Sequence, residues 1–314
     1  MNTLVSDLLS AGRLQEAEWL IRRGASAPFD LSELARRLGT DLDVNSFFIS
    51  PGYYAPLTSW ADAQVCCGEG YEASSVVEQY RNNASQASSP YALGQSIGSY
   101  AIRQLAALQH VWLSLGRPCP FRVLDFGGAL GTHFHALVTH WPWGPLHWTV
   151  CETPAVVSVG QEEFGLHSPQ GHQLCFSSDV QAVLNVGVDL VFASCSLQYL
   201  EHLQPILDFF RLAPWLLIDR VPLIDHSTDL IDIQVVPASY TDTRYPGWKF
   251  AASSWLSRLN NTGFELVFQW LVPEDRWSIL DLDTGSMRWQ AHHDHGFLLR
   301  REHNLRTDQT LMKF

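Results

Sequence analysis

From residue 121 onward the sequence alternates short apolar runs with helix-like segments, and this alternation restricts the fold more than any other feature. Apolar runs of this length suit strands that are covered on both faces, and such strands joined by helices form a parallel sheet. The predicted strands are 122–126, 148–152, 174–176, 189–194 and 215–219. The predicted helices are 131–140, 154–164, 179–185 and 200–212. We therefore expect an α/β, Rossmann-like sheet with helices on both faces.

The sequence on either side of this alternation predicts three further parts. Residues 1–118 are expected to form an N-terminal helical or lid region, with helices at 1–24, 31–38, 73–86 and 90–115 and a loop-rich stretch at 47–72. The Rossmann-like domain is expected to span 119–302 and to contain a loop-rich insertion at about 221–247. After the insertion we expect a helix at 248–261, strands at 264–270 and 296–300, and a C-terminal tail at 303–314.

A glycine-rich turn follows the first predicted strand, in the stretch Phe121–Gly131. Glycine lets the backbone turn sharply and lets a ligand approach without a Cβ in the way. A helix that starts near Gly131 adds unpaired N–H groups and a positive partial charge. This layout suits a ligand that contains a nucleoside, either a dinucleotide or S-adenosylmethionine (SAM).

Two acidic residues favour SAM over a dinucleotide. Asp125 lies two residues before the first glycine, where it can meet the ammonium group of the methionine part, whereas a dinucleotide site favours a neutral residue beside the pyrophosphate. The spacing is G-G-x-x-G and not the G-x-G-x-x-G of dinucleotide sites. Glu152 ends the next strand, where a carboxylate can accept both ribose hydroxyls. An NAD(P)-dependent oxidoreductase remains the alternative enzyme.

The rest of the predicted SAM site follows from the strand ends. Ser178 and Asp179 follow the third strand, where the adenine amine needs an acceptor, although Asp179 is equally suited to cap a helix. Backbone carbonyls near Ser194 and Cys195 are placed to hold the amino group. The predicted cofactor-binding residues are Asp125, Phe126, Gly127, Gly128, Gly131, Glu152, Ser178, Asp179, Ser194 and Cys195.

The methyl acceptor is expected beside the loops 194–199 and 219–222, because ligands of such sheets lie at the carboxyl ends of the strands. Methyl transfer needs close alignment, and a hydroxyl acceptor also needs a base. The predicted catalytic residues are Asp219, His133 and Arg220, with an ion pair to Asp219 or to an acid of the insertion as the alternative role of Arg220. The predicted acceptor-binding residues are Gln198, Tyr199, His226, Tyr240, Tyr245 and Trp248, and Tyr71 and Tyr100 are expected to close over the cofactor.

The histidines do not predict a metal site. His133 and His135 are two residues apart, and such positions diverge on a helix. The histidines of 292–295 precede an edge strand and are expected to be exposed. We therefore predict that no metal takes part.

Seven short segments form a further pattern: Ser59–Ala63, Gly70–Tyr71, Val123–Gly131, Leu217–Pro222, Gln234–Pro237, Tyr245–Trp248 and Gly263–Phe264. With these segments the chain resembles the class I methyltransferases that are often encoded among bacterial surface-polysaccharide and natural-product genes. The resemblance implies a Rossmann-like class I methyltransferase sheet and an activity in biosynthesis, and it leaves the acceptor undefined. Residues 1–48 and the histidine-rich tail lie outside it.

Composition excludes some partners. The net charge of −12 and the absence of a basic run argue against nucleic acid. The six cysteines form no CxxC motif, and no stretch predicts a signal peptide or a membrane span, so we expect a reduced, cytoplasmic protein. The sequence therefore predicts a SAM-dependent methyltransferase for a small-molecule or sugar-containing acceptor. A SAM-binding partner subunit without catalysis is the non-enzyme alternative, and the N-terminal helices suit a homodimer.

Overall fold

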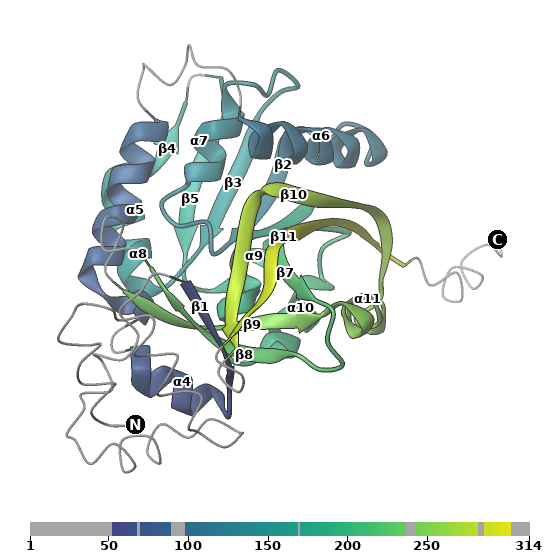
Figure 1. Ribbon diagram of the computed structural model, residues 1–314. Coiled ribbons are helices and arrows are strands. Elements are labelled where there is room, and N and C mark those ends of the chain that lie inside the picture. The colour runs from purple at the N-terminus through teal and green to yellow at the C-terminus, as the bar shows by residue number, and fades with distance from the viewer. Residues whose placement is uncertain are drawn as a thin grey trace, which may run out of the picture.

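The computed structural model of the chain describes residues 52–67, 70–88, 98–168, 170–236, 243–281 and 286–302 (Figure 1). The helices predicted at 1–24 and 31–38, the first part of the helix predicted at 90–115, the candidate Tyr240 and the tail 303–314 lie outside these ranges.

A parallel sheet forms the centre of the molecule, as the alternation predicts. Its strands lie in the order β5 (Gln173–Ser177), β3 (Leu146–Cys151), β2 (Phe121–Phe126), β6 (Leu190–Ser194) and β7 (Trp215–Ile224). The antiparallel strand β11 (Ser286–Arg301) pairs with the other side of β7, and β10 (Phe264–Asp281) pairs with β11. The short strand β4 (Leu166–His167) borders β5. This order confirms the Rossmann-like sheet with its closing strand pair.

Helices cover both faces of this sheet, because the strands are apolar on both sides. One core contains residues of α5 (Ser74–Ala87), α6 (Ser99–Ser114), α7 (Thr132–Val138) and α8 (Pro154–Val159), which a π-helical turn at Gly160–Phe164 extends. The other core contains residues of α9 (Val180–Val186), α10 (Leu203–Phe210) and α11 (Ala252–Asn261). Figure 1 shows α6 and α7 on one side of the sheet and α9 and α10 on the other.

The segment expected to be a loop-rich insertion is instead mainly β-structure. Strand β7 continues to Ile224, and β8 (Leu230–Val235) and β9 (Arg244–Ala251) form an antiparallel pair after it. Helix α11 consequently begins at Ala252 and not at 248. The stretch expected to be loop-rich at 47–72 contains β1 (Gly52–Leu57), α4 (Trp60–Cys67) and a 3-10 turn at Gly70–Glu72.

These additional strands close into a ring with the end of the central sheet. Strand β1 pairs with β8 and β10, β8 pairs with β9, and β9 pairs with the end of β7. Because β10, β11 and β7 are already neighbours, the pairings close a small barrel from β7, β11, β10, β1, β8 and β9. Figure 1 shows these strands crossing at the end of the sheet where β1 lies. Charged residues inside this barrel interrupt the apolar pattern, which explains why its strands resemble loops in the sequence.

Candidate active site

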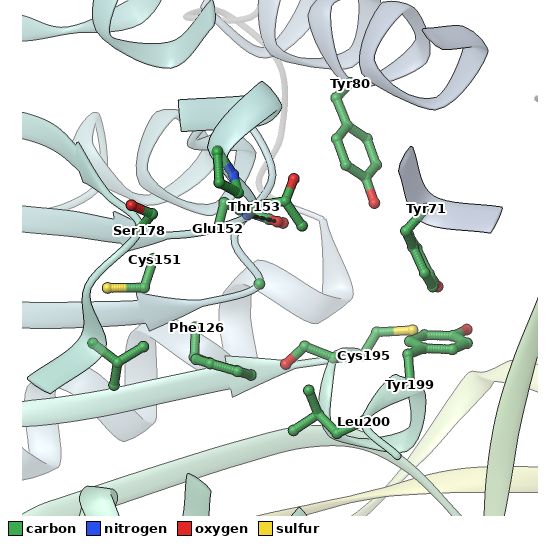
Figure 2. A pocket seen from close by; sticks show the side chains of 14 residues that line it. Tyr71, Tyr80, Phe126, Cys151, Glu152, Thr153, Ser178, Cys195, Tyr199 and Leu200 are labelled. Atoms are coloured by element: carbon green, nitrogen blue, oxygen red, sulfur yellow. Dashed lines mark hydrogen bonds between the residues drawn. The ribbon is translucent and has the colours of Figure 1, made fainter. Parts of the chain in front are cut away.

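A pocket of about 580 Å³ lies where β2, β3, β5 and β6 end. Figure 2 shows Cys151 and Ser178 at one side of this pocket and the rings of Tyr71, Tyr80 and Tyr199 at the other. Its lining consists of Tyr71, Tyr80, Phe126, Gly127, Cys151, Glu152, Thr153, Pro154, Ser178, Val180, Cys195, Ser196, Tyr199 and Leu200. We call it the nucleoside pocket, because it contains the strand ends where the sequence predicts a nucleoside ligand.

The glycine turn borders this pocket and has little space for side chains. Gly127 and Gly131 have φ values of +71° and +81°, in the left-handed region that favours glycine. A Cβ on Gly127 would lie 2.5 Å from the Cβ of Ser196, and one on Gly131 would lie 2.7 Å from Cδ2 of Leu174. The turn therefore presents backbone to a ligand, as the sequence predicts, with Gly127 on the pocket wall.

Asp125 lies beneath this turn and not on the wall of the pocket. It is fully buried, and its Oδ2 accepts a hydrogen bond of 2.9 Å from the indole of Trp148 and lies 3.1 Å from Nδ1 of His133. Its carboxylate packs against Gly128, where a Cβ would approach Oδ2 to 2.3 Å. Asp125 and His133, which the sequence predicts to be a cofactor ligand and a base, thus pair with each other outside the pocket lining.

Glu152 is the carboxylate on the wall of the nucleoside pocket. Its Oε1 accepts the N–H of Ala129 at 3.1 Å, and its Oε2 accepts the N–H of Thr153 at 3.0 Å. Burial raises the pKa of Glu152, and these two backbone donors oppose that rise. One bond to each oxygen fixes the carboxylate in place and leaves further lone pairs to accept ligand hydroxyls. The geometry agrees with the predicted ribose contact.

The predicted adenine residues separate in the structure. Ser178 lines the pocket, beside Val180. Asp179 instead caps α9, since its Oδ1 accepts the N–H of Ala182 at 2.9 Å. For Asp179 the structure therefore shows the capping role that the sequence left open.

The turn after β6 separates the nucleoside pocket from a second cavity. Cys195 and Tyr199 line both, and Gln198 lines the second. Cys195 has a φ of +53°, and its Sγ accepts a hydrogen bond of 3.2 Å from the amide of Gln198. Burial raises the pKa of the Cys195 thiol, so the thiol stays protonated and is a poor nucleophile. Ser194 is buried behind this turn, outside both linings.

A group of tyrosines closes one side of the nucleoside pocket. The ring of Tyr71 stacks on Tyr245 with centroids 3.9 Å apart and meets the edge of Tyr199 at 4.9 Å. Tyr245 therefore supports Tyr71 from behind and does not itself line the pocket. Tyr80 from α5 lines the pocket but was not among the predicted residues, because nothing in a polar helix marks one tyrosine as a ligand contact. Tyr100 lies elsewhere, where its hydroxyl donates to Asp275 at 2.6 Å.

Asp219 does not reach either cavity. It is fully buried, and its two oxygens accept hydrogen bonds from Gln104 at 2.9 Å and from the indole of Trp270 at 3.1 Å. Burial raises the pKa of Asp219. Its carboxylate thereby joins α6 to β10. A carboxylate held in this way outside both cavities is not placed to act as the predicted base. Arg220, whose alternative role was an ion pair with Asp219 or with an acid of the insertion, binds Asp275 of β10, with Nε 2.5 Å from Oδ2.

Replacing Asp219 by alanine should lower the free energy of unfolding and leave ligand binding unchanged. The buried amide of Gln104 and the indole N–H of Trp270 would lose their acceptor, at about 1–3 kcal/mol for an unsatisfied buried group. Denaturant unfolding and calorimetry with S-adenosylhomocysteine (SAH) measure the two effects, with Asp225→Ala at an exposed acid as the control. A large loss of SAH affinity without a loss of stability would contradict the structural role.

Two further candidates lie away from both cavities. His226 lies in the turn between β7 and β8, where its Nδ1 is 2.8 Å from the carbonyl oxygen of Thr228. Trp248 donates its indole N–H to the carbonyl of Leu200 at 2.9 Å and stacks on Trp60. Trp248 thus supports the loop after Tyr199 and does not contact a ligand space.

The second cavity, of about 170 Å³, lies inside the barrel. It is more polar than the nucleoside pocket and includes Arg220, Lys249, Asp275 and Asp294, of which only Arg220 was among the predicted site residues. We call it the barrel cavity. No sequence signal marked Lys249 and Asp275, because their strands were not recognised as a barrel. Asp294 belongs to the histidine cluster 292–295, which was expected to be exposed before an edge strand; it lies instead in β11, which pairs with both β10 and β7, and it is buried.

Within the described ranges, no group of three His, Cys, Asp or Glu residues is arranged to hold a metal ion. The helices of the same ranges are all too short or too polar to cross a membrane.

No protein-family model and no curated protein sequence matches the chain. Among solved structures it is similar to the 1,6-didemethyltoxoflavin-N1-methyltransferase of Burkholderia thailandensis, with 14% identity, 81% of this chain and 95% of the other covered, and a TM-score of 0.41. It is also similar to the magnesium protoporphyrin IX methyltransferase of Synechocystis, at 14% identity, 77% and 97% coverage and a TM-score of 0.40. A SAM-dependent methyltransferase from Clostridium acetobutylicum shows 8% identity, 71% and 99% coverage and a TM-score of 0.43. At these scores the similarities carry no argument about the activity of this chain.

Proposed function

We propose that this chain is a SAM-dependent methyltransferase that acts on a small-molecule acceptor. The observation that carries the proposal is the fixed carboxylate of Glu152 beside the glycine turn, in a pocket whose described lining contains no basic side chain. A carboxylate placed in this way suits the two hydroxyls of a ribose. The absence of lysine, arginine and histidine from that lining favours a ligand with a sulfonium and an ammonium over one with a pyrophosphate.

The residues of the pocket fit the parts of SAM. Glu152 would accept the ribose hydroxyls, and Ser178 and Val180 would border the adenine. The buried Oγ of Ser196 has no hydrogen-bond partner among the described residues and would receive one from the methionine part. Aromatic rings at the opposite side, such as Tyr71, suit the positive sulfur. When bound, SAM would supply an electrophilic methyl group for the acceptor.

The two alternatives predict different results. An NAD(P)-dependent oxidoreductase would hold a pyrophosphate on the backbone of the glycine turn, and a dinucleotide would then stabilise the chain where SAH would not. A partner subunit without catalysis would bind SAM in the same way and transfer no methyl group. The proposal also includes a cytoplasmic location, a role in polysaccharide or natural-product biosynthesis, and a homodimeric state. Light scattering of the purified chain tests the homodimer.

A ligand titration tests the proposal. SAH should raise the thermal unfolding midpoint, with a stabilisation of about 2.7 kcal/mol when its concentration is about 100 times Kd. NAD(H) and NADP(H) at equal concentrations should leave the midpoint unchanged. Stabilisation by a dinucleotide but not by SAH would reject the methyltransferase in favour of the oxidoreductase.

A further inference from the structure

The barrel cavity is built by every strand of the ring. Each strand contributes at least one side chain to the lining: Tyr53 from β1, Arg220 from β7, Gln234 from β8, Lys249 from β9, Trp277 from β10 and Asp294 from β11. Such a closed ring of strands gives a rigid, shaped interior. Burying polar groups inside a small barrel lowers the stability of the fold unless those groups form hydrogen bonds or ion pairs with each other or with a ligand.

The barrel cavity and the nucleoside pocket share one wall. Cys195 and Tyr199, both from the turn after β6, line both spaces. Figure 2 shows the two side chains next to each other at the tyrosine side of the nucleoside pocket, away from Ser178. A group held in the barrel cavity would therefore lie next to the end of the nucleoside pocket that is farthest from the predicted adenine position.

The cations of the barrel cavity are already neutralised. Arg220 pairs with Asp275 at 2.5 Å, and the ammonium of Lys249 lies 2.5 Å from Asp232 and 3.8 Å from the centre of the Tyr53 ring. An anionic ligand would have to compete with these buried pairs for its counter-charge. The cavity consequently disfavours a carboxylate or phosphate group.

Two buried side chains in the lining can accept further hydrogen bonds. Asp294 is 7% exposed, and its only hydrogen bond to the described residues is at Oδ1, from the indole of Trp277 at 2.7 Å. Gln198 is 4% exposed, and its Oε1 has no partner among the described residues while its amide nitrogen binds Cys195. Buried acceptors of this kind normally receive hydrogen bonds, so the lining suits a ligand that donates them.

We propose that the barrel cavity is the acceptor subsite and binds an uncharged, hydroxyl-bearing ring, with Asp294 and Gln198 accepting hydrogen bonds from its hydroxyls. The rings of Tyr53 and Trp277 supply apolar surface for the C–H groups of such a ring. The subsite rests on the proposed methyltransferase function, because the shared wall at Cys195 and Tyr199 matters only if a methyl donor occupies the nucleoside pocket.

The charge of Asp294 depends on all the elements around it. Burial and, after it, the charge of Asp275 on β10 raise its pKa to about 6, and Lys249 on β9, the Trp277 indole and Arg220 on β7 oppose that rise. Tyr53 on β1 and Cys195 face it from the other sides and are protonated at neutral pH. Asp294 is thus ionised, and a full hydrogen-bond acceptor, above about pH 6, so binding of a hydroxyl-bearing ring should weaken below that pH.

Saturation-transfer NMR on the full chain tests the subsite, with SAH present at saturating concentration. Methyl glucoside, an uncharged ring, should receive several-fold more saturation than glucuronate, which carries a carboxylate on the same ring. Asp294→Asn should reduce the methyl glucoside signal several-fold and leave the SAH affinity from calorimetry unchanged. Asp225→Asn, at an exposed acid in the turn after β7, is the matched control and should change neither.

Three results would overturn the subsite: equal or greater saturation of glucuronate, no saturation of methyl glucoside with SAH bound, or a methyl glucoside signal that Asp294→Asn does not change. The SAH measurement separates this inference from the proposed function. If SAH fails to bind the wild-type chain while methyl glucoside still binds in an Asp294-dependent way, the barrel cavity remains a binding site and the methyltransferase assignment falls.

Discussion

Replacing Glu152 by glutamine is expected to weaken SAH binding about 10–100-fold, because hydrogen bonds to a charged group contribute about 1.5–3 kcal/mol each. The carboxylate is held by the N–H groups of Ala129 and Thr153, so it is preorganised and costs little to order on binding. A glutamine amide at this position has one acceptor oxygen where the carboxylate has two, and its NH2 group would face the N–H of Ala129 or of Thr153. Isothermal calorimetry with SAH measures the change.

The control for this prediction is Glu201→Gln. Glu201 is exposed and lies outside the nucleoside pocket, so its substitution should leave the SAH affinity within about twofold, as for surface changes generally. If Glu152→Gln bound SAH as tightly as the wild-type chain, the ribose contact would be excluded, and the proposed function would lose the observation that carries it.

Replacing Gly128 by alanine is expected to lower the free energy of unfolding by about 1–3 kcal/mol, as overpacking of a buried site does. The new Cβ would lie 2.3 Å from Oδ2 and 2.4 Å from Cγ of Asp125. Asp125 has no room to move, because the indole of Trp148 and the ring of His133 both hold its carboxylate. Denaturant unfolding followed by tryptophan fluorescence measures the loss of stability.

The same substitution should also weaken SAH binding, since displacing the glycine turn moves the N–H of Ala129 away from Glu152. Gly98→Ala is the matched control, because a Cβ at Gly98 meets no atom of the described residues within 4 Å and the residue lies far from the turn in sequence. A Gly128→Ala variant as stable as Gly98→Ala would show that Asp125 can be displaced at little cost.

Local patterns were sufficient to predict the parts of the site that lie on the parallel strands. The glycine turn and Glu152 follow apolar runs, and parallel strands bring their carboxyl ends to one edge wherever the helices between them lie. The same local patterns could not predict where the side chain of Asp125 lies. The spacing of two residues between Asp125 and Gly127 does not reveal whether the carboxylate points into a pocket or lies beneath the turn. Here the indole of Trp148, which is distant in sequence, holds the carboxylate beneath the turn.

Residues of the barrel could not be predicted from the same patterns. Segments expected as loops, such as 221–247 and 47–72, contain β1, β8 and β9, whose inward side chains include Asp232 and Lys249. An ion pair buried in a barrel removes the apolar alternation by which a strand is recognised. The pairing of β1 with β8 and β10 joins segments about 175–225 residues apart, which no local spacing reveals.

The sequence by itself determined the parallel sheet, its covering helices, the glycine turn and the acid at the end of β3, because each depends on residues close together in the chain. The tertiary structure alone decided which of the acids are available to a ligand. It placed Asp125 and Asp219 in buried hydrogen bonds outside both cavities, and it brought Asp294 to the wall of the barrel cavity. Burial and partners, and not residue type, set these roles, because a carboxylate is satisfied or free only through groups that folding brings to it.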